Sequence, residues 1–313
     1  MSAVVLQLKA LGIDNLLQFE FLDPPSTDAL ERALDHLFLL GAMNAKGELT
    51  VTGRRMAEFP LDPSLSKCLI KGCALKCGRH MAMAAAMLSL DSVFINTRDP
   101  KERQLLDSAK TQLFAFGNGD VTGYIRLMED WLRSGSQSAN FCKANCVHPR
   151  ALIRARDVMD QIMRTFDRIG LDVGQEEGLI NVESITKALL SGFFFNVSKL
   201  ELDNRTYSII RPLSGGEATV DLESRLAELH PTSFLFKAGS FKKNENKEYD
   251  PSLPPVLKER PSFIVFTQLR RTTKRYMIHV SAILEKDWIL KSAPENYFTE
   301  AELETGLRKR PRS

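Results

Sequence analysis

The sequence predicts an α+β protein with several domains: a winged helix, then an all-α helical bundle, then an OB-like β-barrel. Helical periodicity, interrupted once near residue 50, dominates the chain to about residue 170. From about residue 176 onward, short runs rich in β-branched and aromatic residues alternate with turn signals. The predicted boundaries are 1–60 for the winged helix, 61–175 for the bundle, 176–298 for the barrel and 299–313 for a basic tail.

The composition is that of an ordinary soluble protein. The 313 residues are 43% apolar and 26% charged, with a formal net charge of only +3, and the length suits two or three domains. No apolar stretch approaches the roughly 20 residues that span a bilayer. The N-terminus "MSAVVLQLKA" lacks the basic start and long apolar region of a signal peptide. We therefore expect no membrane partner and a nuclear or cytosolic location.

The cysteines predict neither disulfides nor a metal site. Their number, five, is odd and small for a chain of this length. Their spacings, C-x4-C-x3-C and C-x3-C, fit no ordinary zinc pattern, although His80 and His148 lie near the two groups. We expect buried, reduced thiols on helices.

Residues 1–60 have the outline of a winged helix, whose N-terminal part we expect to be incomplete. The segment "AVVLQLKALG" has helical periodicity and ends at Gly12. A second helix begins after a Pro-Pro pair, with Thr27 as the predicted N-cap and Gly41 just past its end. The segment "KGELTVTGRRMAEFP" then predicts a turn, a short strand at 49–52 and another turn.

Residues 61–175 predict a helical bundle. Two apolar-rich helices, "SLSKCLIKGCALKC" and "HMAMAAAMLSL", come first, and we expect their methionines to fill the core. An amphipathic helix opens after Gly119-Asp120, and a long helix starts after Pro149 and runs to about Gly170. The long helix combines an apolar face with a cationic face, made of Arg150, Arg154, Arg156, Arg164 and Arg168.

The third region predicts one helix, "NVESITKALLSGFF", followed by a small barrel. Six runs are expected to contain strands: "FFNVSKLEL", "TYSIIRPL", "ATVDL", "SFLF", "SFIVFTQL" and "YMIHVSAIL". Five or six short strands over about a hundred residues are typical of an OB-like barrel. The polar segment 237–260 is predicted to be a mobile loop, and the end, "LRKRPRS", a disordered basic tail.

No local motif indicates an enzyme active site. The chain contains no G-x-x-x-x-G-K-[ST] loop, no G-x-G-x-x-G after a strand, no G-x-S-x-G and no H-E-x-x-H. Its Gly117-Asn118-Gly119 and Gly215-Gly216 segments are interpreted as turns, and the five histidines are scattered.

The charge distribution is more informative than the net charge. Residues 237 to 275 contain ten Lys and Arg against four Asp and Glu, a local charge of +6, and four cations fall within "LRRTTKRY" (269–276). Dense cations on a nearly neutral chain suit a phosphate backbone, because each neutralised phosphate releases counterions. The alternative, which composition alone leaves open, is an exposed edge strand that its charges keep from aggregating.

The segment "GELTVTGRRMAEFPLDPSLSKCLI" (47–70) carries the more specific pattern G-x-L-T-x-x-G-x-x-x-A-x-x-P-x-x-P. Seven further segments fall in a recognisable order: "VVLQLKALGIDNLLQFEFLDPP" (4–25), "GDVTGYIRLMEDW" (119–131), "FCKANCVHPRALIRARDVMDQI" (141–162), "ITKALLSGFF" (185–194), "LHPTS" (229–233), "SFIVFTQLRRTTKRYM" (262–277) and "WILKSAPENYF" (288–298). Over nearly the whole chain they resemble the C-terminal region of DEAH-box, or RNA helicase A-type, ATP-dependent RNA helicases.

The resemblance implies a winged helix, a ratchet-like helical bundle and an OB fold. In complete members these domains pack against two RecA-like motor domains, and together they enclose single-stranded RNA. ATP and Mg bind in the RecA-like domains, so no cofactor is expected in this chain and its status as an enzyme stays open. The motor would precede residue 1. The chain is therefore expected to be a cut piece, a partial gene product or a true short product.

The resemblance also implies which residues contact RNA. Thr273 and Lys274 match the family's T-[TS]-K element in the OB fold, with Arg270, Arg271 and Arg275 as electrostatic neighbours. Asn145 and Arg150 match its N-F-x-x-x-R element in the bundle, where a structural ion pair is the alternative role for Arg150. Contacts through backbone and stacking, without strong sequence choice, are expected.

The chain departs from the family pattern at several positions. Val121 replaces a His, Phe141 another aromatic residue, and Cys146 a Phe. Where members often have W-V-I-Y-N-E, this chain has "FIVFTQ" (263–268), and the Arg that usually follows Y/F-M is Ile278. Most of these replacements keep apolar volume, so the expected fold is unchanged.

Two functions follow as hypotheses. The first is an auxiliary RNA-contacting module of a DEAH-box helicase of pre-mRNA splicing or ribosome biogenesis, located in the nucleus and also in the cytoplasm. The second is a protein-interaction module that binds glycine-rich G-patch activators or the spliceosome, favoured by exposed apolar residues around Leu8, Leu11 and Leu16. An independent enzyme has no supporting site.

Overall fold

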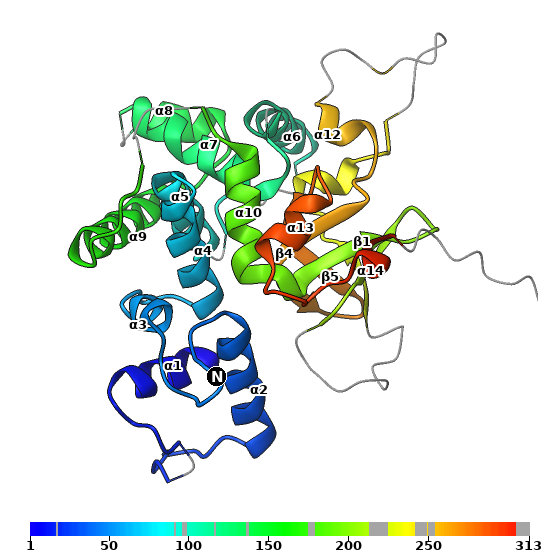
Figure 1. Cartoon of the computed structure of the whole chain (residues 1–313). Coiled ribbons are helices and arrows are strands. Elements are labelled where there is room, and N and C mark those ends of the chain that lie inside the picture. The colour runs from blue at the N-terminus through cyan, green and yellow to red at the C-terminus, as the bar shows by residue number, and fades with distance from the viewer. Residues whose placement is uncertain are drawn as a thin grey trace, which may run out of the picture.

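Three lobes follow one another along the chain in the computed structural model (Figure 1). It describes residues 1–16, 18–90, 92–95, 99–115, 117–135, 138–174, 179–212, 225–241, 249 and 254–304. The N-terminal helices form one lobe, seven helices form a second, and a closed five-strand barrel forms the third, with α10 running between the second and third. Among the described helices, none combines the length and apolarity that crossing a bilayer requires.

The winged-helix lobe contains α1 (Ser2–Ala10), α2 (Thr27–Leu39) and α3 (Val51–Ala57). The cap of α2 differs by one residue from the prediction: the Ser26 hydroxyl, not Thr27, accepts the Ala29 N–H. Gly41 ends this helix with a left-handed φ of 71°, as expected.

The strand predicted at 49–52 is wrong. Only one bridge, Met43 to Leu49, forms there, and a helix starts at Val51. The physical reason is the Thr50 hydroxyl, which accepts the Gly53 N–H at 3.0 Å and so caps α3. Gly53 itself lies against the Ala42 carbonyl, because a Cβ there would be 2.0 Å from that oxygen. The L-T-x-x-G motif therefore encodes a capped helix and a close backbone contact.

The bundle lobe is all-helical, as predicted. Its helices are α4 (Pro63–Ala74), α5 (Gly78–Leu88), α6 (Pro100–Phe114), α7 (Asp120–Arg133), α8 (Ala139–Ala144), α9 (Pro149–Arg168) and α10 (Val182–Phe193). The Met- and Ala-rich α5 is buried from Met81 to Met87, so its methionines fill the core. Helix α10 packs closely on α4, because a Cβ on Gly192 would lie 2.2 Å from the Ser64 carbonyl oxygen.

The cysteines of the bundle are free, and four of them are buried. Burial raises the pKa of the Cys73 and Cys77 thiols to about 12, so both stay protonated at neutral pH. Within the described residues, no group of three His, Cys, Asp or Glu side chains has metal-binding geometry.

The barrel is closed, with strand order β1-β2-β3-β5-β4. Its strands are β1 (Val197–Leu200), β2 (Thr206–Ile209), β3 (Leu226–Leu229), β4 (Phe263–Arg271) and β5 (Arg275–Ala282). All neighbours are antiparallel except β3 and β5, which run parallel and place Glu228 opposite Tyr276. This parallel pair between antiparallel hairpins closes the five-strand OB architecture.

In the barrel, one predicted strand is wrong and one observed strand was not predicted. The run "SFLF" is not a strand: Phe234–Lys237 forms a 3-10 helix, η2, because the Ser233 carbonyl accepts the Phe236 N–H. Strand β3 was not predicted, since "LAEL" lacks β-branched and aromatic residues and pairs only because its neighbours are in place. The predicted strand "ATVDL" and the Gly215-Gly216 turn lie outside the described residues.

The predicted loop 237–260 and the predicted tail 299–313 are described only in part. Residues 242–248 and 250–253 lie outside the described part of the loop, and α12 (Pro255–Lys258) closes it. After α13 (Asp287–Ser292), α14 (Glu300–Glu304) occupies the start of the predicted tail, with Leu303 buried and Glu302 paired to Arg211 at 3.1 Å. Residues 305–313, which hold the basic tail residues, lie outside the described chain.

The bundle and the barrel meet at the loop before α7. The Asp120 carboxylate, 3% exposed, accepts the Phe234 N–H at 2.7 Å and the Val280 N–H at 2.8 Å. The Asn118 amide donates to the Ala282 carbonyl at 2.6 Å. Gly119 allows this contact, because a Cβ there would lie 2.3 Å from the Val280 carbonyl oxygen. The segment interpreted as a turn is a buried docking loop between two domains.

Candidate nucleic-acid interface

The predicted contact residues of the OB fold lie at the tip of the β4–β5 hairpin. Arg271 and Arg275 are the last pair of the ladder, and Thr272 to Lys274 form the turn, in which the Thr272 N–H bonds the Lys274 carbonyl at 2.8 Å. Thr273 is exposed at this turn. The register of the two strands therefore brings four cations into one hairpin end.

Lys274 does not project freely from the hairpin. Its Nζ lies 2.8 Å from Glu228 Oε1 on β3, and Arg205 Nη2 lies 3.1 Å from the other oxygen of the same carboxylate. Burial alone would raise the pKa of Glu228, but the two cations hold it below its ordinary value. Glu228 is therefore an anion that neutralises part of the positive charge at the hairpin.

A small side pocket lies beside this ion-pair group. Its volume is about 230 Å³, and Phe236, Arg260 and Tyr276 line it together with the three ion-paired residues. Tyr276 packs edge-on against His230, with ring centroids 5.4 Å apart. Sequence reasoning missed Arg205, Glu228 and Arg260 because only the folded barrel brings them near Lys274. A signal did exist for Arg205, which directly follows the turn-forming pair Asp203-Asn204 and donates its N–H to Asp203 Oδ1.

Arg270 belongs to a different part of the hairpin from Lys274. Its positive charge contributes, after burial, to lowering the pKa of His230 and of His279. Arg271 and Arg275 form no ion pair with any described residue. The predicted cluster thus divides: Lys274 lies at the side pocket, and Arg270 lies toward the two histidines and the bundle.

Asn145 and Arg150 occupy the connection between α8 and α9. The Asn145 Nδ2 donates to the Phe141 carbonyl at 3.0 Å, so this side chain closes α8. Arg150 is exposed in the first turn of α9 and has no ion pair among the described residues, which leaves its guanidinium available and does not support the structural alternative. No described contact joins these two residues to the hairpin tip.

A series of ring contacts nevertheless connects the two regions. Val147 pairs with Phe94 in an isolated bridge. The Phe94 ring lies 6.3 Å from that of Tyr124, and the Tyr124 ring lies 5.6 Å from that of His279 on β5. The α8–α9 connection and the barrel are therefore linked by a series of packed side chains.

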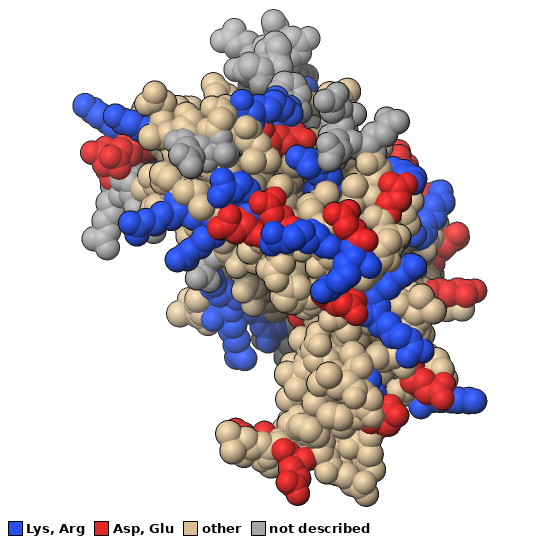
Figure 2. All heavy atoms as spheres, turned by 90° about the vertical axis from the view of Figure 1, so that its left-hand side faces the viewer, with Lys and Arg blue, Asp and Glu red and all other residues tan. Residues whose placement is uncertain are grey.

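The cationic face predicted on α9 is only partly available. Arg168 pairs with Glu58 at 2.9 Å and Arg156 with Asp157 at 3.2 Å. Arg150, Arg154 and Arg164 are exposed and make no ion pair within the described chain. Figure 2 shows Lys and Arg interleaved with Asp and Glu across the upper part of this side of the molecule. A local set of three arginines is the usable charge here.

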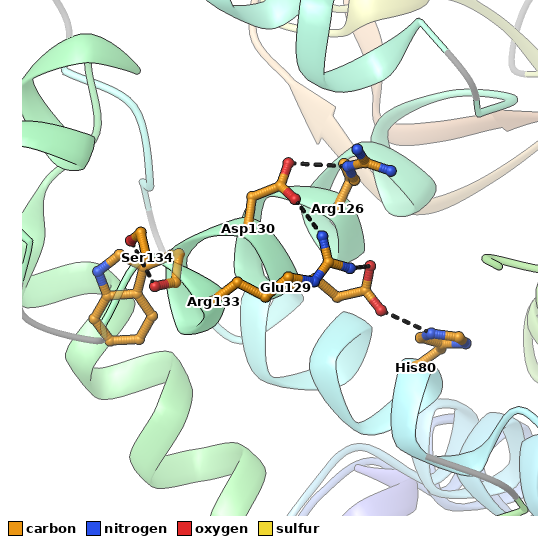
Figure 3. Close-up of polar contacts among 7 residues, drawn as sticks. His80, Arg126, Glu129, Asp130, Arg133 and Ser134 are labelled. Atoms are coloured by element: carbon orange, nitrogen blue, oxygen red, sulfur yellow. Dashed lines mark hydrogen bonds and ion pairs between the residues drawn. The ribbon is translucent and has the colours of Figure 1, made fainter. Parts of the chain in front are cut away.

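Other charges of the bundle form a network along α7 that reaches α5 through one bond (Figure 3). His80 on α5 bonds Glu129 on α7 at 3.0 Å, and Arg133 bridges Glu129 and Asp130 at 3.1 and 2.8 Å. Arg126 completes the network with a 2.9 Å bond to Asp130. Burial opposes ionisation of Glu129, but the bond from His80 and the two arginines hold its pKa below the ordinary value.

The winged helix exposes apolar side chains, although not all of the predicted ones. Leu8 and Leu16 are buried in the lobe's own core, which overturns their assignment as surface residues, because both face inward. Leu11 is 77% exposed, and Val4 and Phe38 are about half exposed. The lower lobe in Figure 2 accordingly presents a broad area with few charged side chains.

The fold and this surface define a helicase-associated module that carries an OB fold. Family models match three consecutive parts of the chain: the winged-helix form of the helicase associated domain (HA2) at 33–61, its ratchet-like form at 62–123, and an oligonucleotide/oligosaccharide-binding (OB) fold at 185–297. In this order, these domains are the C-terminal module of DEAH-box helicases, and the chain carries that module. It is thus a helicase auxiliary module in a nucleic-acid-binding context.

Proposed function

We propose that the chain is the RNA-contacting auxiliary module of a DEAH-box ATP-dependent RNA helicase of pre-mRNA splicing or ribosome biogenesis. We place the protein in the nucleus, with the cytoplasm as a second location. Its partners are single-stranded RNA and the RecA-like domains, which hold ATP and Mg in complete members. The chain's own task is to bind and orient the strand while the motor moves it.

One observation carries this proposal: the β4–β5 hairpin presents exposed Thr273 and Arg271 and partly exposed Arg275 beside Lys274 on an OB barrel. Hydroxyl and cationic groups at the end of a hairpin suit ribose and phosphate contacts, which do not depend on sequence. Arg150 adds a cation on the bundle with no described acidic partner.

Fluorescence anisotropy with labelled oligo-U at several salt concentrations tests the proposal. The double variant Lys274→Ala, Arg271→Ala is expected to bind about ten-fold more weakly. Its plot of log K against log salt should be shallower by roughly 1.4, since each phosphate contact on a single strand contributes about 0.7. The charge-matched control Lys76→Ala, Lys291→Ala removes two exposed, ion-paired lysines elsewhere and should change neither quantity. Millimolar binding that the double variant leaves unchanged would refute RNA contact.

The second candidate is a protein-interaction module for G-patch activators or the spliceosome. The exposed Val4, Leu11 and Phe38 of the winged helix favour it, because a lobe with few charges and several exposed apolar side chains suits a protein partner. A labelled glycine-rich G-patch peptide should bind the wild-type chain and lose affinity about ten-fold with Leu11→Ser plus Val4→Ser. Equal binding by the variant would reject this surface.

A further inference from the structure

A cavity of about 400 Å³ lies where the three domains meet. Its volume falls within the range of about 300 to 1,000 Å³ that small-molecule sites occupy. The winged helix contributes His36, the start of α4 contributes Asp62, and the barrel side contributes the groups that matter most: Phe195, Thr267, Gln268 and His279.

One wall of the cavity is aromatic. Phe195 is half-buried and contacts the rings of Phe193, Phe194 and His36, with centroids 6.3, 5.4 and 5.1 Å away. Leu65 and Leu88 line the cavity as well. These contacts hold the Phe195 ring in place, so a planar group entering the cavity meets a fixed apolar surface.

Other residues of the lining carry polar groups that the fold does not use. Neither the Thr267 hydroxyl nor the Gln268 amide has a hydrogen-bond partner among the described residues, and the His279 imidazole makes only a ring contact, with Tyr124. An amide offers both donors and an acceptor, and a hydroxyl offers one of each. Such a set can bond the edge of a heterocycle in more than one pattern.

The charge of the cavity excludes a phosphate as its occupant. None of the described residues that line it is Lys or Arg. Burial lowers the pKa of both histidines, which are therefore neutral at pH 7, and His36 already bonds Ser2 at 3.0 Å and Ser64 at 3.2 Å. Asp62 adds a negative charge, and its Oδ1 accepts the Ser64 N–H. A neutral planar group fits where an anion does not.

The backbone at the cavity is strained. His279 has a left-handed φ of 55° in the middle of β5, where a non-glycine residue rarely adopts it. The ladder pairs Phe266 with Val280 and Gln268 with Ile278 but leaves Thr267 and His279 unpaired between them. Such conformations are energetically unfavourable and persist only where the surrounding structure enforces them. They are found most often at binding and active sites.

The residue paired with Gln268 across the hairpin offers it no polar contact. Gln268 on β4 faces Ile278 on β5 in the ladder. Ile278 is buried and apolar, whereas Gln268 is exposed. The Gln268 amide therefore has no polar neighbour directly across the ladder.

We propose that this cavity accommodates one unstacked base of the bound RNA strand, with Phe195 against its face and Gln268 and Thr267 bonding its edge. Single-stranded RNA is commonly recognised in this way, by aromatic contact and edge hydrogen bonds to a splayed base. Arg270 follows Gln268 by two strand residues, roughly 7 Å, and lies close enough for the adjoining phosphate. The inference rests on the proposed function and adds a base-dependent site to its backbone contacts.

The test compares two labelled 12-mers, oligo-U and a ribose-phosphate strand without bases, on the full chain. Gln268→Ala and Thr267→Val should each weaken oligo-U binding about three- to ten-fold and leave the baseless strand unchanged, since only the base is bonded. Gln104→Ala, an exposed glutamine on α6, is the matched control and should alter neither affinity. Unlabelled uridine should displace oligo-U only weakly, because the base enters as part of a strand.

The outcomes separate the two claims. Equal loss for both strands, or no loss for either, overturns the base site while RNA binding stands. If free uridine displaces oligo-U at the same concentration as an unlabelled competing strand does, the cavity is a nucleoside site. This outcome also overturns the proposed base site. Failure of both strands to bind at low salt overturns the proposed function and the base site together.

Discussion

At the scale of single residues, the candidate contact residues could be predicted from the sequence, but the residues that they pair with could not. The hairpin cations could be found from "LRRTTKRY" because four of them stand within eight residues. Their partners could not, since Glu228 on β3 and Arg205, which directly precedes β2, come near Lys274 only in the closed barrel. Leu8 and Leu16 fail for the same reason: whether an apolar residue faces in or out depends on packing that periodicity over ten residues does not resolve.

The ion-paired Glu228 leads to a prediction of increased affinity. Glu228→Gln removes the carboxylate that holds Lys274 at 2.8 Å and Arg205 at 3.1 Å, so both cations become available to phosphates. Oligo-U should bind roughly five-fold more tightly at low salt, with a steeper salt dependence. The control Glu285→Gln removes an exposed carboxylate from the loop after β5 and should have no effect beyond two-fold. Weaker binding by Glu228→Gln, measured by the same anisotropy titration, would show that the pair orients Lys274 productively.

At the scale of elements, long periodic segments were predictable and short ones were not. The helix from Pro149 to about Gly170 was predicted within two residues, because its apolar stripe spans five turns between proline and glycine signals. The strand at 49–52 failed because a Thr hydroxyl capping α3 outweighs the β-propensity of Val and Thr. The docking loop before α7 looked like an ordinary turn, since its partners are more than 100 residues away in the chain.

The docking loop should be essential for stability. Asp120→Ala leaves the buried N–H groups of Phe234 and Val280 without an acceptor, and the expected loss is about 3 kcal/mol in the free energy of unfolding. Asp157→Ala removes an exposed carboxylate on α9 and should cost less than about 0.5 kcal/mol. Urea unfolding followed by circular dichroism measures both. A loss below 1 kcal/mol for Asp120→Ala would mean that the two domains do not depend on this carboxylate.

The α5–α7 network predicts a pH dependence. The pKa of Glu129 is lower in the folded chain than its ordinary value of 4.5, so its ionisation stabilises the fold above that pH, and the contribution disappears as the pH falls through the lower, folded value. Glu129→Gln should cost about 1 kcal/mol at pH 7, and this cost should shrink as the pH falls below 4.5. Thermal unfolding of both proteins across this range gives the difference. A cost that stays constant with pH would assign it to packing rather than to charge.

At the scale of the whole molecule, the order of the domains could be predicted from the sequence, but the contacts between the domains could not. Separate motifs gave the winged helix, bundle and barrel, because each domain has its own periodicity. Their assembly into one body is visible only in the structure, where a single cluster of buried apolar residues runs from Val5 to Leu303. The cavity at the three-domain junction follows from that assembly, and so no sequence pattern marks it.

A continuous core predicts that the three domains unfold together. The two tryptophans report on different domains, since Trp131 is buried in α7 of the bundle and Trp288 in α13 beside the barrel. The variants Trp288→Phe and Trp131→Phe each keep one tryptophan. In each variant, the midpoint of unfolding measured by fluorescence should therefore coincide with the midpoint measured by circular dichroism. In Asn118→Ala, which removes the 2.6 Å bond to the Ala282 carbonyl, the two curves should separate, with Trp288 responding first because the barrel then loses part of its attachment. Midpoints that already differ without Asn118→Ala would show that the barrel unfolds on its own and that the junction cavity is not rigid.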